Sequence, residues 1–308
     1  MCGSPIAEHL CVAEGAASTN STNRTKGNER LATRLKDASV LWAQGGLGNQ
    51  LFQLNAGLTM SEEPGDLLVS TSSYGRDRLR QFELGALLSP LALTTSTEDF
   101  RLGQPYDWRG RQRSKSRDRS MTNVFSDPHP LPSAFRPRTF NIGFFQDEAS
   151  LALPSKATTA LLIEYRRTAS SRRAAKSRPV LHVRRGDYTS SPAAQRTFGT
   201  LSRRYYDAAC SALGIRVEDC VIFTDDPAAV EHEFGVPRSD IVGPEDIESP
   251  LDTLVAMSHA SALVIPNSTF SWWAAELASG APVVAPSTWF FDRPGNLRRP
   301  GWVAVPNA

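Results

Sequence analysis

Two arginines at the end of an apolar segment are the strongest chemical signal in this sequence. They belong to the run LHVRRGDY, residues 181–188, in which an apolar strand ends in Arg184, Arg185 and a glycine turn. A guanidinium keeps its proton and can hold a diphosphate through two parallel hydrogen bonds, so it can stabilise the charge on a departing nucleoside diphosphate. The structural alternative is an ion pair between an arginine and Asp187 that braces the turn.

A second polar segment, NSTFSWW at residues 267–273, follows the apolar stretch Leu263–Ile265 and opens an apolar helix. The free N–H groups at the start of that helix, together with Ser268 and Thr269, predict an anion site. The alternative is a plain N-cap, because Asn, Ser and Thr are common capping residues. We expect Trp272 and Trp273 to pack in the core rather than to form a sugar platform.

Two further segments complete the set of candidates. Asp225 and Asp226 end the apolar run Val221–Thr224, where a carboxylate could accept hydrogen bonds from a guanine edge or from ribose, or could cap the helix that begins at Pro227. The loop GGLGNQ, residues 45–50, resembles part of a dinucleotide fingerprint, but Leu51 replaces its third glycine. A metal site is not expected, because the sequence contains no D-x-D triplet.

These segments lie at the carboxyl ends of predicted strands. Apolar runs predict strands at residues 40–43, 67–69, 180–183, 221–224, 263–265 and 283–285, and helices near residues 203–213, 227–234, 251–259 and 270–279. Strands that alternate with helices predict parallel sheets with helices on both faces, whose ligands bind beyond the carboxyl ends of the strands. We therefore expect two Rossmann-like domains that face each other across a cleft.

The predicted division of the chain has three parts. Residues 1–37 are rich in Ser, Thr, Asn, Gly and charge and predict a disordered tail. Residues 38–175 form the first domain, on the acceptor side, and residues 176–308 form the second, which binds the donor. The stretch from about residue 71 to 147 holds many Pro and Arg residues and has no assignable period.

Composition excludes several classes of protein. A net charge of +2 is too small to indicate a nucleic-acid partner, and no stretch approaches the roughly 18 apolar residues of a membrane span. Glu8, His9 and Glu14 interrupt any secretory leader, and no Cys-x-x-Cys pair is present, so we expect a cytoplasmic protein. The basic run Arg109–Arg119 predicts a solvated loop, and its alternative is a peripheral contact with anionic lipid or another polyanion.

Taken together, the segments GGLGNQLFQ, GFFQ (143–146), HVRRGDY, FGTLSRRYY (198–206), FTDDP and NSTFSWWAAEL resemble glycosyltransferase family 11, the alpha-1,2-fucosyltransferases. Their order and spacing match from about residue 40 to 291. The resemblance implies a GT-B-like fold, GDP-fucose as donor, a galactoside-terminated glycan as acceptor, inversion at the anomeric carbon and no required metal or other cofactor.

The resemblance also implies roles for individual residues. Arg184 holds the β-phosphate, His182 lines the guanine pocket and Asp225 or Asp226 meets the base. Phosphate contacts are expected from Ser268, Thr269 and Ser271 in the turn after residues 263–265. Apart from the resemblance, Asp187 is one candidate for the general base, and an ion pair with an arginine is its alternative role. The complete set of expected donor-site residues is His182, Arg184, Arg185, Asp225, Asp226, Asn267, Ser268, Thr269, Ser271, Gly46, Gly48, Asn49 and Gln50.

Two rival functions remain at this point. A protein of the same fold could bind a nucleotide or sugar without turnover. The glycine loop and the strand–helix alternation also suggest an NAD-type oxidoreductase, which the missing third glycine disfavours.

Overall fold

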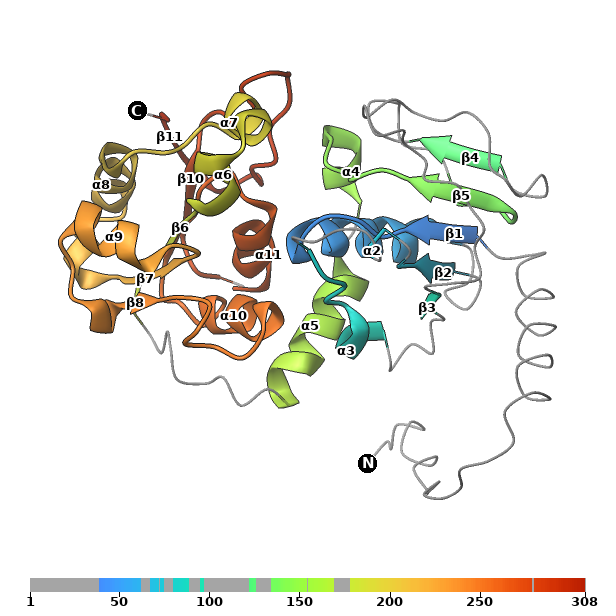
Figure 1. Cartoon of the computed structure of the whole chain (residues 1–308), viewed down its shortest axis with the longest axis horizontal. Coiled ribbons are helices and arrows are strands. Elements are labelled where there is room, and N and C mark those ends of the chain that lie inside the picture. The colour runs from blue at the N-terminus through green and yellow to red at the C-terminus, as the bar shows by residue number, and fades with distance from the viewer. Residues whose placement is uncertain are drawn as a thin grey trace.

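The computed structural model of the chain describes residues 39–61, 67–71, 73–74, 80–88, 95–96, 122–125, 134–153, 155–168, 178–278 and 280–307. These residues form an α/β structure with two parallel sheets, which Figure 1 shows on opposite sides of the molecule. The predicted disordered tail and the basic run Arg109–Arg119 lie outside the described residues.

The first sheet has the strand order β3-β2-β1-β5-β4, and every neighbouring pair is parallel. From β1 the chain adds β2 and β3 on one side, whereas β5 and β4 lie on the other side. The strand order therefore changes direction between β1 and β5. Its strands are β1 Ser39–Trp42, β2 Leu67–Ser70, β3 Thr95–Ser96, β4 Thr122–Phe125 and β5 Thr139–Ile142, and its helices are α2 Leu47–Met60, α3 Gly85–Leu88, α4 Glu148–Ala152 and α5 Lys156–Thr168.

The second sheet has the order β11-β10-β9-β6-β7-β8, again parallel throughout. Its strands are β6 Val180–Val183, β7 Val221–Thr224, β8 Ile241–Val242, β9 Leu263–Val264, β10 Val283–Pro286 and β11 Val303–Val305. Its helices are α6 Gly186–Ser190, α7 Pro192–Phe198, α8 Arg203–Ala212, α9 Pro227–Phe234, α10 Pro250–Met257 and α11 Thr269–Leu277, with 3-10 turns at Val217–Asp219 and Arg238–Asp240. This is the strand order of the Rossmann fold, and its direction changes between β6 and β9.

The structure confirms most of the predicted elements in the second sheet. Strands 180–183 and 221–224 and helix 227–234 have the predicted bounds, and the other predicted strands and helices differ by one or two residues at their ends. Helix α10 begins as its sequence predicts, because Ser249 accepts a hydrogen bond from the Asp252 N–H and Pro250 takes the first helical position.

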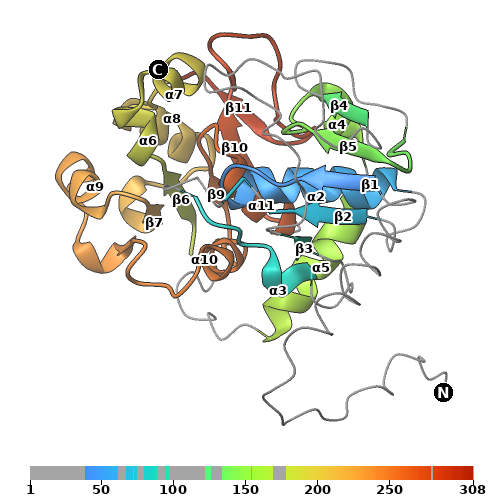
Figure 2. The same ribbon diagram turned by 45° about the vertical axis from the view of Figure 1, so that its right-hand side comes forward.

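Helices α2 and α11 join the two sheets, and they lie side by side in Figures 1 and 2. The Phe52 ring lies 4.7 Å from the Trp272 ring and 5.3 Å from the Trp273 ring. Both tryptophans are almost fully buried, which confirms their predicted packing role. One continuous apolar core includes residues of both sheets, so the division of the chain into two domains stays a prediction.

Gly48 allows α2 and α11 to approach closely at their N-termini. A Cβ atom at this position would lie 2.4 Å from the backbone nitrogen of Phe270 and the carbonyl carbon of Thr269. Any other side chain would therefore have to push the two helices apart.

None of the helices in the described part of the chain is long and apolar enough to cross a membrane.

Candidate active site

A pocket of about 740 Å³ lies where the carboxyl ends of the two sheets meet. This volume is typical of small-molecule sites, and ligands of parallel α/β sheets bind where the strand order changes direction. Residues that follow β1 and β5 line the pocket from one side, and residues that follow β6, β7 and β9 line it from the other. Nine predicted site residues line it: Gly46, Gly48, Asn49, His182, Arg184, Asp187, Asp225, Ser268 and Thr269.

Asn49 connects the two points at which the strand order changes. Its side-chain oxygen accepts hydrogen bonds from Gln146 Nε2 at 2.8 Å and from Thr269 Oγ1 at 2.9 Å. Gln146 ends the segment GFFQ after β5, and Thr269 is the first residue of α11. The Asn49 carboxamide in the pocket wall therefore fixes the glycine loop after β1 against the start of α11, which follows β9 of the second sheet.

Arg184 is held between two carboxylates. Its Nη2 donates to Asp187 Oδ1 at 2.5 Å, and its Nη1 lies 2.7 Å from Asp225 Oδ2. Burial opposes the charge of the guanidinium, but Asp225 and Asp187 outweigh burial and raise the pKa of Arg184 above its ordinary value. The Tyr188 ring lies under the guanidinium, 5.6 Å from ring centroid to Cζ. Arg184 is a permanent cation with a fixed orientation in the pocket.

Asp187 bridges the two halves of the pocket. Its Oδ2 accepts a hydrogen bond from Arg80 Nη2 at 2.5 Å, while its Oδ1 binds Arg184. Arg80 comes from the stretch that sequence patterns left unassigned, and it also lines the pocket. The predicted structural alternative for Asp187, an ion pair with an arginine, is therefore present in this structure, twice over.

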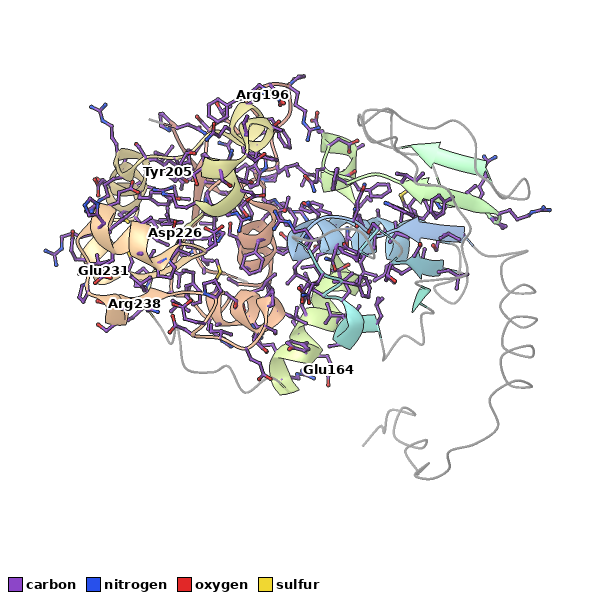
Figure 3. The ribbon with its side chains drawn as sticks, viewed as in Figure 1. Glu164, Arg196, Tyr205, Asp226, Glu231 and Arg238 are labelled. Carbon is purple, nitrogen blue, oxygen red and sulfur yellow. The ribbon has the colours of Figure 1, made fainter. Side chains whose placement is uncertain are left out.

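Asp225 and Asp226 have different positions. Asp225 lines the pocket, accepts from the Arg185 backbone N–H at 2.8 Å and binds Arg184. Asp226 caps α9, where its side chain accepts from the Ala229 N–H at 3.1 Å, and Figure 3 labels it beside that helix. Of the two carboxylates, only Asp225 can meet a ligand in this pocket.

Gly186 leaves the space that Asp225 occupies. A Cβ atom at Gly186 would lie 2.2 Å from Asp225 Oδ2, the oxygen that binds Arg184. The glycine of the HVRRGDY segment therefore permits the contact between Asp225 and Arg184.

His182 is a neutral, buried group in the pocket wall. Burial, together with the nearby charge of Arg184, lowers the pKa of His182 to about 3. Its ring lies 5.6 Å from the Phe270 ring, and its Nδ1 atom has no hydrogen-bond partner among the described residues. A buried nitrogen without a partner is costly, so His182 favours a ligand that satisfies it.

The start of α11 provides further donors. Ser268 is the N-cap, Thr269 is the first helical residue, and both line the pocket together with Phe270. The first N–H groups of a helix have no partner within it, and the helix dipole favours an anion at this end. This arrangement can bind a phosphate or a diphosphate.

The structure places five other predicted site residues outside the pocket lining. Arg185 is buried and binds Glu233 at 2.7 Å, and Gln50 holds the carbonyl oxygens of Gly45 and Gln81. Asn267 donates to the carbonyl oxygens of Phe198 and Trp289, and the Ser271 hydroxyl donates to the carbonyl oxygen of Ser268. These four side chains support the loops that form the pocket, and Asp226 caps a helix.

Sequence patterns missed several residues that line the pocket. The missed polar ones include Arg80, Glu83 and Arg293, and the missed aromatic ones include Phe144 and Phe198. The two aromatic residues carried a signal through the resemblance, because Phe144 lies in the GFFQ segment and Phe198 begins the FGTLSRRYY segment. The described residues contain no group of three or more His, Cys, Asp or Glu side chains placed to hold a metal ion.

Comparisons with known proteins match part of this chain to glycosyltransferases. Residues 170–305 match the family model described as glycosyl transferase family 11. An O-antigen biosynthesis glycosyltransferase, WbnK of Escherichia coli, is 33% identical over 129 residues, which are 40% of this chain and 43% of that protein. An alpha-1,2-colitosyltransferase of Escherichia coli is 32% identical over 117 residues, which are 36% of this chain and 40% of that protein. The matches thus span less than half of these relatives' length.

A solved structure shows a weaker likeness. It is a NodZ alpha-1,6-fucosyltransferase soaked with GDP-fucose, at 12% identity and a TM-score of 0.41, with 79% of this chain and 92% of that chain covered. A likeness of this size carries no argument about fold or function.

Proposed function

Residues 170–305 belong to glycosyl transferase family 11, and from this premise we propose that the chain is an inverting alpha-1,2-fucosyltransferase. It moves L-fucose from GDP-fucose to the 2-hydroxyl of a galactoside-terminated glycan. We propose a GT-B-like architecture, with one Rossmann-like domain for the donor and one for the acceptor. The two parallel sheets and the pocket between their carboxyl ends support this architecture.

The position of Arg184 is the observation that carries the proposal. Its guanidinium lies in a pocket that the start of α11 also lines, so a permanent cation and a helix N-terminus converge on one space. Negative charge develops on the departing diphosphate in glycosyl transfer from a nucleoside diphosphate sugar. Donors already oriented toward that charge stabilise the transition state with little reorganisation.

The donor and acceptor take opposite sides of the pocket in this proposal. The guanine base lies beside His182 and Asp225, and the diphosphate lies between Arg184 and the start of α11. The acceptor enters from the first sheet, past Gly46 and Asn49, and its 2-hydroxyl attacks C1 of the β-linked sugar as GDP departs. Binding both substrates in these positions places the reacting atoms together, which lowers the entropic part of the barrier.

A relative favours one second candidate. Because one matched protein is an alpha-1,2-colitosyltransferase, the sugar moved by this chain can be colitose instead of fucose, through the same linkage. The nucleotide half of the pocket serves both donors, and the sugar half has to distinguish them.

Product analysis tests both candidates. The purified chain is incubated with GDP-fucose, GDP-colitose or GDP-mannose and a small panel of β-galactosides, and the linkage of each product is determined. We expect an alpha-1,2-linked product with one of the first two donors. A product with a different linkage, or binding of GDP without any product, would contradict the proposed transferase.

Removal of metal tests how the diphosphate is neutralised. If Arg184 and the start of α11 provide the positive charge, turnover survives EDTA at the untreated rate. Complete loss of turnover with EDTA and recovery with manganese or magnesium would contradict this prediction.

A further inference from the structure

Transfer to a hydroxyl requires a group that accepts its proton, and among the described residues four carboxylates line the pocket. They are Glu83, Asp187, Asp225 and Glu248. A general base must reach the acceptor hydroxyl, and its oxygen must be available to take up a proton. The four carboxylates differ in both respects.

Asp187 and Asp225 are already occupied by donors. Each oxygen of Asp187 binds an arginine, and the oxygens of Asp225 bind the Arg184 side chain and the Arg185 backbone N–H. Protonation of either aspartate would remove the counter-charge of Arg184. Glu248 is exposed to solvent in the loop after β8, on the side of the pocket proposed for the nucleotide.

Glu83 is the carboxylate that remains. It is half-buried, and its side chain has no hydrogen bond or ion pair with the described part of the chain. It reaches the pocket from the first sheet's half of the chain, three residues after Arg80, which meets Asp187 across the pocket. Glu83 therefore lies on the proposed acceptor side.

The backbone of Glu83 is firmly held. The side-chain oxygen of the buried Gln50 accepts from the Glu83 N–H at 2.9 Å, and Gln50 Nε2 donates to the carbonyl oxygens of Gln81 at 2.8 Å and Gly45 at 3.0 Å. The next residue, Leu84, is buried in the core. One glutamine thus fixes Glu83 relative to the glycine loop that lines the same pocket.

We propose that the Glu83 carboxylate is the general base that deprotonates the acceptor hydroxyl, an inference that rests on the proposed transferase function. The hydroxyl proton moves to Glu83 as the acceptor oxygen forms its bond to C1 of the sugar. The bond between C1 and the phosphate oxygen breaks, and its electron pair leaves with GDP. The protonated Glu83 then returns its proton to water.

The electrostatic surroundings of Glu83 agree with this role. Burial raises the pKa of Glu83 above its ordinary value, because water is partly excluded from its charged form. A base whose pKa moves toward the working pH takes up a proton more readily in the transition state.

The test compares Glu83→Gln with the wild-type chain. Loss of a general base lowers turnover by about 10²–10⁴-fold, so we expect a fall of that size for transfer to a galactoside. GDP should still raise the melting temperature of the variant, because the proposed nucleotide contacts are on the other side of the pocket. Glu231→Gln is the matched control, since Glu231 is exposed on α9, far from α2 in Figure 3.

Azide separates a base from a merely structural residue, because it is a nucleophile without a proton to lose. With azide and the donor, Glu83→Gln should form the glycosyl azide at least as fast as the wild-type chain, while its transfer to galactosides stays low. Wild-type turnover should decrease at acidic pH, where Glu83 becomes protonated. This decrease should be absent from Glu83→Gln.

The outcomes distinguish the two proposals. Turnover of Glu83→Gln within threefold of wild type would overturn the role of Glu83 alone, as would parallel loss of galactoside transfer, azide reaction and GDP binding. A wild-type chain that binds GDP but transfers no sugar would overturn the proposed function, and the role of Glu83 with it.

Discussion

Arg184 has two partners in this structure, Asp187 and Asp225, and both can be explained without a ligand. The structural and the phosphate-binding interpretations of Arg184 therefore share one geometry. The two interpretations predict different effects when Arg184 is replaced by lysine. Lysine keeps the positive charge but lacks the planar guanidinium that can form two parallel hydrogen bonds.

Substitution Arg184→Lys separates these interpretations. Loss of one preorganised donor to a developing charge costs about 10²–10³-fold in turnover, and we expect a fall of this size with a melting temperature within a few degrees of wild type. Arg178→Lys is the control, because Arg178 precedes the same strand at its opposite end and binds Asp240 at 2.7 Å. A variant with normal turnover but a much lower melting temperature would make Arg184 a brace.

His182 makes a second prediction, on stability against pH. Its pKa of about 3 in the folded chain lies below the ordinary 6.5, so the unfolded chain takes up a proton that the folded chain refuses. The contribution of neutral His182 to the free energy of unfolding is fully present above pH 6.5 and is lost as the pH falls from 6.5 toward 3. Between pH 7 and 5 the free energy of unfolding should decrease by about 2 kcal/mol more in wild type than in His182→Phe.

Urea unfolding at the two pH values measures this difference. His232→Asn, a change at an exposed histidine of α9, should keep the wild-type response. An unchanged pH response in His182→Phe would show that another group is responsible.

At the scale of elements, the N-terminus of α2 lies directly against that of α11. Gly48 permits this approach, and Asn49 connects both helices to the segment after β5 through Gln146 and Thr269. The pocket wall is therefore an assembly of helix starts, and its shape depends on how closely they approach.

Gly48→Ala tests that dependence. The new methyl group would meet the α11 backbone at 2.4 Å, and overpacking of this kind costs about 1–3 kcal/mol of stability. We expect a lower melting temperature and a smaller stabilisation by GDP. Gly85→Ala is the control, because its new Cβ would have no neighbour within 4 Å apart from the adjacent residues and the backbone of its own helix. Full GDP stabilisation in Gly48→Ala would contradict a role for this contact in shaping the pocket.

Much of this assembly could be predicted from the sequence, and the reason is periodicity. The strands that end at Val183 and Thr224 are short apolar runs with clear ends, so the residues after them could be placed at the edge of a sheet. Capping chemistry also explains why Asp226 rather than Asp225 is the helix cap, although the sequence alone allowed either.

Arg80 and Glu83 could not be predicted in this way. Their segment has no apolar period, and it is positioned by the Gln50 side chain and by the pair of Arg80 with Asp187. Such long-range side-chain contacts leave no local pattern. The buried support roles of Arg185 and Asn267 also depend on long-range contacts. The sequence did not reveal these roles, because both residues belong to motifs whose other members face the pocket.

At the scale of the whole molecule, the two sheets share one apolar core. Phe52 of α2 contacts both tryptophans of α11, and α5 binds α10 through the Tyr165 hydroxyl, which donates to Asp252 Oδ1 at 2.9 Å. A division into two domains therefore need not produce two units that unfold separately.

Phe52→Ala tests this coupling. Truncation of a buried phenylalanine costs about 3–5 kcal/mol, and we expect the variant to unfold in one transition at a lower temperature. Hydrogen exchange should become faster in α11 as well as in α2. Phe291→Ala, at a ring that is 52% exposed, should have little effect. Two separate transitions, with α11 exchange unchanged, would show that the sheets are independent.

In the proposed reaction, the charges around Arg184 have a consequence for the release of GDP. Arg80 and Arg184 carry two positive charges, and Asp187 and Asp225 carry two negative ones, so this cluster is neutral when the pocket is empty. A bound diphosphate makes the cluster anionic, and its oxygens compete with the two aspartates for the N–H groups of Arg184. When GDP departs, Asp187 and Asp225 regain these donors, so no guanidinium is left without a counter-ion. We therefore expect the carboxylates that orient Arg184 also to limit how tightly GDP is retained.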